Sequence, residues 1–498
     1  MRKITIRDTD HEAKGSISTV SRVIKMKNAV LSNLGGFVRN SVKTALNGLM
    51  SFFSAFVHRF KNGNMATRAS HIIMGFGNFY HKQIIKGFIY LLFQAGFILF
   101  MVLCPQINDT PLGYKALINF TTLGTEAGDI FTKADDSMLM LLFGVVTMGI
   151  IALFFLLYLS NLKSAYKAEC DKQKKGRASG FREDIRELFD NRFHITLLTP
   201  SFVGVAFFTI MPTIFMIFIA FTNFDSAHQG EVLFDWVGFA NVKTLLTKTG
   251  EIGQRFIPVL SWTLVWAVFS TFTCYFGGIF LGILINRKGV RYKTLFRTIF
   301  ILTIAMPQFV SLLAIRNILG ELGPFNTLLV NTGILSEPVS FLANSDSILR
   351  ARITIIAANF WIGVPYTMLM TSGILLNIPA DLYEAARIDG AGPLKCLVKI
   401  TMPYILFVTT PYLISSFIGN FNNFNVIYLL TEGRPAAVGG YKAGATDLLV
   451  TWLFKLSVNE REYNLGSLIG IMTFLCTSTI TLLTYRHSKA YKEEDAFQ

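Results

Sequence analysis

Eight long apolar segments dominate this 498-residue chain. A helix needs roughly 20 apolar residues to cross a bilayer core about 30 Å thick. The segments lie at about 84–104, 138–161, 196–221, 259–285, 296–319, 353–376, 404–430 and 464–485. Because lipid offers no partners to backbone groups, and because the segments lack the alternation of barrel strands, each is predicted to be a helix. We therefore expect an all-α integral membrane protein with about eight transmembrane helices.

The composition excludes the other broad classes of protein. Charged residues make up only 15% of the chain, hydrophobic residues make up 52%, and the mean hydropathy is +0.47. Soluble domains carry about a quarter charged residues. These values exclude a soluble globular, a disordered or a fibrous protein. The net charge of +15 lies mostly between the apolar segments, which favours a role in membrane topology over nucleic-acid binding.

The placement of Lys and Arg predicts the orientation in the membrane. Basic residues concentrate ahead of the first segment, between the second and third, and between the fourth and fifth. The 105–137 loop instead has Lys115 and Lys133 against five acidic residues. Cytoplasmic loops carry the excess of basic residues, so both termini are predicted to be cytoplasmic. The loop 431–463 carries four basic residues and is an exception.

The stretch 17–62 spaces apolar residues among Lys, Arg and Ser at roughly helical intervals. A basic amphipathic helix of this kind is typical of segments that lie on an anionic membrane surface. The same pattern fits a helix packed on the rest of the protein, and the sequence leaves both interpretations open.

No pattern in the chain indicates catalysis or an energy source. The five cysteines are scattered, and no histidine belongs to an HExxH pair or a Cys cluster, so no metal site or metalloprotease is predicted. The chain has no GxxxxGK[ST] phosphate loop. Ionisable residues, which proton- and ion-coupled transporters use as relays, are nearly absent from the span interiors. The energy for any transport is therefore expected to come from a separate ATPase.

A polar loop, NIPADLYEAARIDGAGPLKCLVKITMPYI at 377–405, separates the sixth and seventh spans. Asp381 is a plausible N-cap with Glu384 three residues later, as in a capping box. Gly390, Gly392 and Pro393 are expected to end the helix. The loop predicts a short helix beneath the membrane, either as a docking element for another protein or as an ordinary interfacial helix.

The seventh span carries an unusual number of neutral polar side chains. At helical spacing, Ser416, Asn420 and Asn423 share one face. Because an unpaired amide in hydrocarbon is costly, this face is expected to meet a partner helix or a water-filled cavity. It fits hydrogen bonding between helices and sugar binding equally well. Small residues at Gly277, Gly278 and Gly282, and at Gly466 and Gly470, predict close helix packing.

The polar loop resembles a known family motif. The runs Glu384-Ala385-Ala386, Asp389-Gly390-Ala391 and Ile400-Thr401-Met402-Pro403 are similar to the EAA motif of ABC-importer permeases. Over about 355–450 the chain resembles the MalF-type maltose/maltodextrin permeases, notably in WIGVPY, DLYEAARIDGAGP and ISSFIGNFNNFNVIYLLTEGRP. The short loop 222–258 stands where the enteric proteins have a large domain, so the resemblance is to a compact form.

This resemblance implies a type I ABC importer permease core. The implied organisation is a cytoplasmic basic N-terminal region at 1–83, accessory transmembrane helices at 84–221, a short extracellular loop at 222–258, a permease core at 259–486 with a coupling loop at 377–403, and a cytoplasmic tail at 487–498.

The resemblance also implies the site residues. The residues expected to couple to an ATPase are Leu382, Glu384, Ala385, Ala386, Asp389, Gly390 and Ala391. The residues expected to bind substrate are Gly363, Tyr366, Ser416, Gly419, Asn420 and Asn423. The family has Phe where this chain has Gly419, so one aromatic contact to the sugar is missing.

The implied function is that of a non-catalytic translocation subunit in the cytoplasmic membrane of a bacterium, importing maltose and maltodextrins. The chain itself would bind no cofactor, and the partner ATPase would use ATP. The implied partners are a homologous MalG-like permease, two copies of the ATPase, an extracellular solute-binding protein and membrane lipid, with no nucleic acid. Two alternatives stay open: an ABC permease for another oligosaccharide, and an ion-coupled secondary sugar transporter.

Overall fold

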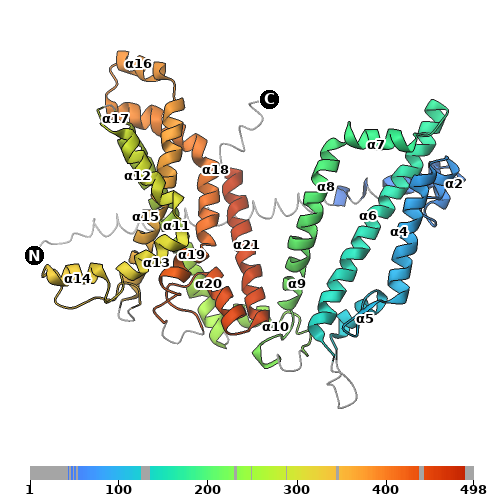
Figure 1. The fold of residues 1–498 in the computed structure, drawn as a ribbon, viewed down its shortest axis with the longest axis horizontal. Helices are drawn as coiled ribbons and strands as arrows, with labels where there is room; N and C mark the ends of the chain where they lie inside the picture. The colour runs from blue at the N-terminus through green and yellow to red at the C-terminus, as the bar shows by residue number, and fades with distance from the viewer. Residues whose placement is uncertain are drawn as a thin grey trace, which may run out of the picture. The chain divides into compact units, whose positions relative to one another are not determined.

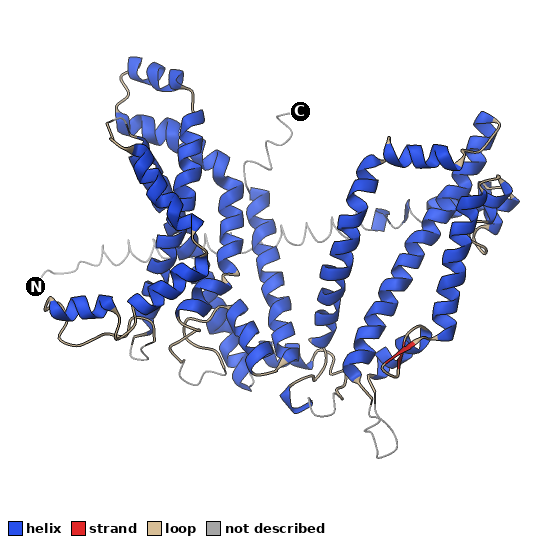
Figure 2. Cartoon of the chain, viewed as in Figure 1, coloured by secondary structure: helices blue, strands red, loops and turns tan. Residues whose placement is uncertain are grey.

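The structure is a computed structural model that describes residues 43, 46–48, 50–51, 54–124, 135–228, 233–247, 250–287, 289–343, 347–436 and 442–487. The described residues are mostly helical, with one hairpin of strands β1 (Gln106–Ile107) and β2 (Thr110–Pro111) (Figure 2). The chain divides into two compact units, Met1–Lys115 with Val146–Val205, and Ala116–Val145 with Ala206–Gln498.

The first unit contains the helices that precede the expected core. They are α2 (Met65–Ala69), α3 (Phe76–Tyr80), α4 (Ile84–Leu103), the larger part of α6 (Ser137–Lys175), α7 (Phe181–Phe189) and α8 (Phe193–Val205), and helix α5 (Tyr114–Thr122) begins at its border. Helix α6 extends well beyond the predicted end at residue 161. Residues 1–42 lie outside the described part of the chain, so the interpretation of 17–62 stays a prediction.

A buried carboxylate holds the segment before α4 against α6. Glu169 is 6% exposed and accepts from the backbone amide of Asn64 with both oxygens, at 3.0 and 3.1 Å. It also accepts from the hydroxyl of Thr67 at 2.6 Å. His81 lies beside this cluster, and burial together with the positive charge of Lys172 lowers its pKa, because both disfavour the charged imidazole.

The second unit contains the longer series of helices (Figure 1). They are α9 (Met211–Ile219), α10 (Ala240–Leu246), α11 (Gly250–Asn286), α12 (Lys293–Ala305), α13 (Gln308–Ile318), α14 (Pro324–Asn331), α15 (Ile348–Asn377), α16 (Ala380–Ile388), α17 (Pro393–Cys396), α18 (Met402–Phe421), α19 (Phe424–Leu430), α20 (Leu449–Phe454) and α21 (Tyr463–His487). Short helices also occur at η1 (Ala206–Ile210), η2 (Ser226–His228), η3 (Leu397–Thr401) and η4 (Lys455–Asn459).

Seven helices in the described residues are long and apolar enough to cross a membrane, and an eighth span is a bent pair. The bend corrects the prediction of one helix at 296–319, because α12 and α13 meet at 94°. The cause is Pro307, which has no backbone N–H to donate and whose ring keeps Met306 extended, with ψ 134°. The prediction of about eight spans holds when this pair counts as one.

Glycines allow α11 and α15 to approach closely, as the sequence predicts. A Cβ at Gly278 would lie 2.4 Å from the Cβ of Thr367, and one at Gly282 would lie 2.9 Å from the Cβ of Thr371. Any side chain at these positions would push the two helices apart. The pair α11 and α15 is therefore closely packed, and within the second unit α12, α13, α18 and α19 lie against it.

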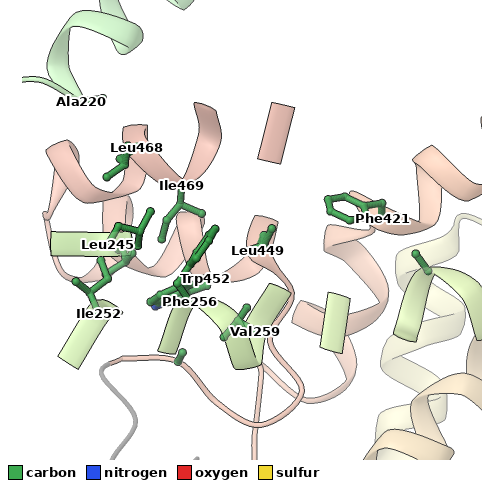
Figure 3. Packing of buried hydrophobic residues seen from close by; sticks show 13 residues of the cluster. Ala220, Leu245, Ile252, Phe256, Val259, Phe421, Leu449, Trp452, Leu468 and Ile469 are labelled. Carbon is green, nitrogen blue, oxygen red and sulfur yellow. The ribbon is translucent and has the colours of Figure 1, made fainter. Parts of the chain in front are cut away.

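One apolar core of the second unit lies where α11 meets α20 and α21 (Figure 3). Trp452 is fully buried in it, between Phe256 and Val259 of α11 and Leu468 and Ile469 of α21. Burying an aromatic side chain of this size stabilises a fold by roughly 1.5–3 kcal/mol or more. This core holds α20 and α21 against α11.

Candidate functional site

Helix α16 lies outside the helix bundle, between the ends of α15 and α17 (Figure 1). None of its side chains is buried. Leu382 is 48% exposed and Ile388 is 86% exposed, although both are large apolar residues. The seven predicted coupling residues, Leu382, Glu384, Ala385, Ala386, Asp389, Gly390 and Ala391, all lie on this helix or in the turn that ends it. The helix therefore presents a small, partly apolar surface with no partner among the described residues of the chain.

The start of α16 differs from the prediction. Pro379 occupies the N-cap position, and no side chain caps the helix, so the expected capping box of Asp381 and Glu384 is wrong. Proline favours an extended residue before it, and Ile378 has ψ 122°, so the helix begins immediately after the proline. Asp381 then falls in the first turn, where its negative charge complements the helix dipole.

The end of α16 confirms the predicted stop at Gly390. Gly390 has φ +76°, in the left-handed region that favours glycine. Its amide donates to the carbonyl of Arg387 at 3.0 Å, and the amide of Ala391 donates to the carbonyl of Ala386 at 2.8 Å. These two bonds form a Schellman motif. The motif fixes the direction in which the chain leaves the helix toward α17.

One side chain ties α16 to the next span. The hydroxyl of Tyr383 lies 2.9 Å from the hydroxyl of Thr401, which is 5% exposed at the base of α18. Sequence reasoning missed Tyr383, because a tyrosine in a polar loop carries no signal of a specific partner. Its contact links α16 to the start of α18.

The seventh span is broken near the middle of its polar face, where the sequence predicts one helix over 404–430. Helix α18 ends at Phe421 and α19 begins at Phe424. Asn423 caps α19, because its side-chain oxygen accepts from the amide of Val426 at 3.2 Å. Its amide nitrogen donates to the side-chain oxygen of Asn420 at 3.4 Å. The structure thus brings Asn420 and Asn423 together across the break.

Asn420 also bonds to α11. Its side-chain amide donates to the hydroxyl of Thr271 at 3.0 Å, and its backbone carbonyl accepts from the indole of Trp266 at 3.0 Å. Both bonds fix the end of α18 on the central helix. Asn420 therefore already serves as a hydrogen-bonding link between helices, one of the two interpretations that the sequence leaves open.

Tyr366 and Ser416 meet through a residue that sequence reasoning missed, Tyr412. The rings of Tyr366 and Tyr412 stack with centroids 5.5 Å apart and planes at 28°. Tyr412 has hydrogen bonds to Ser416 and, at 3.2 Å, to Thr367. Tyr366 is 54% exposed, so one face of an aromatic pair stays open. The only signal in the sequence is a tyrosine one turn before Ser416 in an apolar span.

The two predicted glycines have different surroundings. A Cβ at Gly363 would lie 2.6 Å from the sulfur of Cys274, so this glycine packs α15 against α11. At Gly419 no heavy atom lies within 4 Å of such a Cβ, and the residue is exposed. The structure therefore places Gly419 beside open space and Gly363 at a helix contact.

Among the described residues, no group of three or more His, Cys, Asp or Glu side chains could hold a metal ion. Asn420 and Asn423 supply neutral amides at the break in the seventh span. The hydroxyls of Tyr412 and Thr367 and the Tyr366–Tyr412 stack lie almost three turns earlier along α18. Such groups bind neutral hydroxylated ligands by hydrogen bonding and stacking.

Comparisons with known proteins agree that the chain is similar to membrane permeases of transport systems. Residues 278–490 match the family described as binding-protein-dependent transport system inner membrane component. The chain is 34% identical to the galactooligosaccharides transport system permease protein GanP of Bacillus subtilis, over 85% of this chain and 97% of the relative. It is 33% identical to the maltodextrin transport system permease protein MalC of Streptococcus pneumoniae, over 85% and 96%.

More distant matches cover less of the chain. The maltose/maltodextrin transport system permease protein MalF of Escherichia coli is 32% identical over 51% of this chain and 49% of that protein. A chain of a bacterial ABC transporter that imports alginate has a similar structure, with a TM-score of 0.51 and 20% identity, over 61% of this chain and 97% of that chain. This likeness concerns the fold alone.

Proposed function

Since the chain belongs to the family of binding-protein-dependent transport system inner membrane components and is an ABC importer permease of the sugar-transporting kind, we propose that it forms half of a translocation pathway. The substrates of this pathway are short oligosaccharides, and maltodextrins are the first candidates. A separate ATPase dimer supplies the energy. A homologous permease completes the pathway, and an extracellular solute-binding protein delivers the sugar.

The observation that carries this proposal is helix α16. It is held away from the bundle, ended by a Schellman motif, and tied to α18 through Tyr383 and Thr401. Its exposed surface, which includes Leu382 and Ile388, fits a cleft on a cytoplasmic partner. In this proposal both termini are cytoplasmic, and closure of the ATPase dimer on ATP moves α16 and, through the tether, α18.

The substrate site in this proposal lies at the break between α18 and α19. Asn420 and Asn423 offer amide groups, Ser416 offers a hydroxyl, and Tyr366 offers an exposed ring. The open space at Gly419 admits a wider or differently placed sugar than a phenylalanine would. Gly363 supports the site indirectly, because it sets the distance between α15 and α11.

Galacto-oligosaccharides are the second candidate substrates. The relative named for galactooligosaccharides is 34% identical to this chain, and the relative named for maltodextrins is 33% identical. Sequence identity therefore does not indicate which of the two sugars is the substrate. Both classes present neutral hydroxyl groups and pyranose faces, which suit amides and an aromatic ring equally.

Uptake by the assembled transporter tests the proposal. Proteoliposomes with the permease pair, the ATPase and the binding protein should accumulate labelled maltodextrin only with internal ATP, and a parallel assay with a labelled galacto-oligosaccharide identifies the preferred sugar. ATP-independent accumulation driven by an ion gradient would instead support the secondary-transporter alternative. Retention of the ATPase and the second permease on the purified chain tests the partners separately.

A further inference from the structure

An apolar groove runs between α11 and α15, at the end of this helix pair that is remote from α16. It encloses about 620 Å³. The groove is lined by Pro258, Trp262, Val265, Phe269, Arg352 and Ile353, with three further residues of the same two helices. Apart from one serine and the arginine, the lining side chains are apolar. The groove is therefore mostly apolar, with Arg352 as the one cation in its lining.

Arg352 supplies this cation, and it lacks a counter-charge within the described chain. Its guanidinium lies 4.1 Å from the ring centroid of Trp262. Its Nε and Nη2 donate to the carbonyl of Ala445 at 3.1 and 2.8 Å. No ion pair of Arg352 occurs among the residues that the structure describes. A cation next to hydrocarbon is costly without an anionic partner.

A second cavity of about 100 Å³ adjoins the groove at this arginine. It shares Trp262 and Arg352 with the groove and is also lined by Arg255 and Asp447. The carboxylate of Asp447 is fully buried and bonds to Lys455 at 2.6 Å, so its charge is balanced by another partner. The groove and the small cavity therefore meet at Arg352, and the carboxylate nearest to this meeting point is already paired with Lys455.

Beyond the groove, α11 has a stripe of exposed phenylalanines. Phe269 is 53% exposed, Phe272 is 40% exposed and Phe276 is 50% exposed. About 14 residues separate Trp262 from Phe276, which at 1.5 Å per residue is about 21 Å. One leaflet with its headgroup region is about as thick, since a whole bilayer measures about 40–45 Å with both headgroup regions. The distance from the level of Arg352 to the end of the stripe therefore suits one phospholipid.

We propose that this groove binds one anionic phospholipid. The phosphate lies against Arg352, where the groove meets the small cavity, and an acyl chain follows Val265 and Phe269 along α11. Guanidinium groups bind phosphate oxygens with paired hydrogen bonds, which are strong next to hydrocarbon. The apolar lining excludes a free phosphate ion or a sugar as the occupant of the whole groove. The lipid would brace α11, α15 and the backbone at Ala445 against one another.

Native mass spectrometry of the purified full chain tests this inference. The protein is extracted from nanodiscs of equal parts phosphatidylglycerol and phosphatidylcholine, and the retained lipid is counted. We expect one phosphatidylglycerol to be retained in preference to phosphatidylcholine. Arg352→Gln should reduce that retention about tenfold or more, because it removes a charge-assisted bond to the phosphate. Arg350→Gln is the matched control, since Arg350 lies on α15 but lines neither cavity.

A second variant separates loss of the site from loss of the fold. Val265→Trp fills the groove while leaving Arg352 in place, and it should also reduce retention of phosphatidylglycerol. Equal retention of the two lipids by the unaltered chain would overturn the inference, as would equal retention by the Arg352→Gln and Arg350→Gln proteins. So would efficient crosslinking from an Ile353→Cys variant to the second permease in the assembled transporter, because a protein would then cover the groove.

Discussion

The hydroxyl groups of Tyr383 and Thr401 lie 2.9 Å apart and connect the exposed helix α16 to the base of the span α18. Thr401 is buried. Among the described residues, α16 makes no comparable polar contact with the bundle apart from that of Tyr383. In the proposed mechanism this single bond transmits motion of α16 to the span that carries Asn420. It is therefore the point where coupling is most easily interrupted without unfolding the protein.

Replacing Tyr383 with phenylalanine should weaken coupling. The change removes one hydrogen bond, worth about 1 kcal/mol, and keeps the ring. We expect ATP-driven sugar uptake to fall about fivefold while the ATPase still binds. Uptake and ATP hydrolysis are measured together in proteoliposomes. Tyr404→Phe on α18 is the control, and an equal loss in both variants would contradict a specific role for Tyr383.

Replacing Gly390 with alanine should disturb the end of α16. Gly390 has φ +76°, which costs a residue with a Cβ about 1 kcal/mol. We expect weaker binding of the ATPase by about fivefold, with unchanged membrane insertion, and a smaller effect for Gly390→Asn. Gly392→Ala is a matched control, because Gly392 has φ −72° and open space around its Cβ position. Binding of all three variants with unaltered affinity would contradict the docking role.

Replacing Asn423 with serine should separate its two contacts. A serine oxygen still caps α19, but the amide that reaches Asn420 and the proposed sugar is lost. We expect the sugar concentration for half-maximal uptake to rise about three- to tenfold, with unchanged thermal stability. Asn422→Ser is the control, since Asn422 is exposed and its side-chain amide donates to the carbonyl of Ile418 within its own helix. If Asn422→Ser has the larger effect, the proposed site is misplaced.

Replacing Gly363 with alanine should separate α15 from α11. The new Cβ would lie 2.6 Å from the sulfur of Cys274, so the helices must shift. Overpacking of this kind costs about 1–3 kcal/mol. We expect a lower melting temperature of the purified protein in detergent, partly restored by the additional change Cys274→Ala. No restoration in the double variant would show that the strain lies elsewhere.

The stability of the first unit should depend on pH through His81. Burial and Lys172 lower the pKa of His81 from its ordinary value of 6.5, so the folded state binds this proton less readily than the unfolded state. The contribution to stability is therefore complete above pH 6.5 and is lost as the pH falls from 6.5 through the lowered pKa. Melting temperatures at pH 5.5 and 7.5 should differ less in His81→Gln than in the exposed-site control His58→Gln. Equal differences would contradict this assignment.

The existence of the spans was predictable from sequence, but their interruptions were not all predictable. Apolar length alone identifies helices, since lipid forces backbone groups to pair within a segment. Pro307 offered a local reason for the bend between α12 and α13. The break at Asn423 had no such sign, because an asparagine in a span serves a helix interface and a helix cap equally well.

The candidate site was predictable in its residue types but not in its connections. Gly390 could be identified as a helix stop because glycine adopts the left-handed conformation of a helix C-terminus more readily than any other residue. The expected cap at Asp381 was wrong because Pro379 shifted the start of the helix. Tyr412 could not be found, because only the packing of α15 against α18 shows that it stacks on Tyr366 and bonds to Ser416.

Reconstitution of the purified chain with and without its proposed partners tests the central claim most directly. The measurement is accumulation of labelled maltodextrin and galacto-oligosaccharide in proteoliposomes, with ATP or an ion gradient as the energy source. The account predicts accumulation only when the ATPase, the second permease, the binding protein and ATP are all present. Accumulation of either sugar by this chain alone under an ion gradient would contradict it.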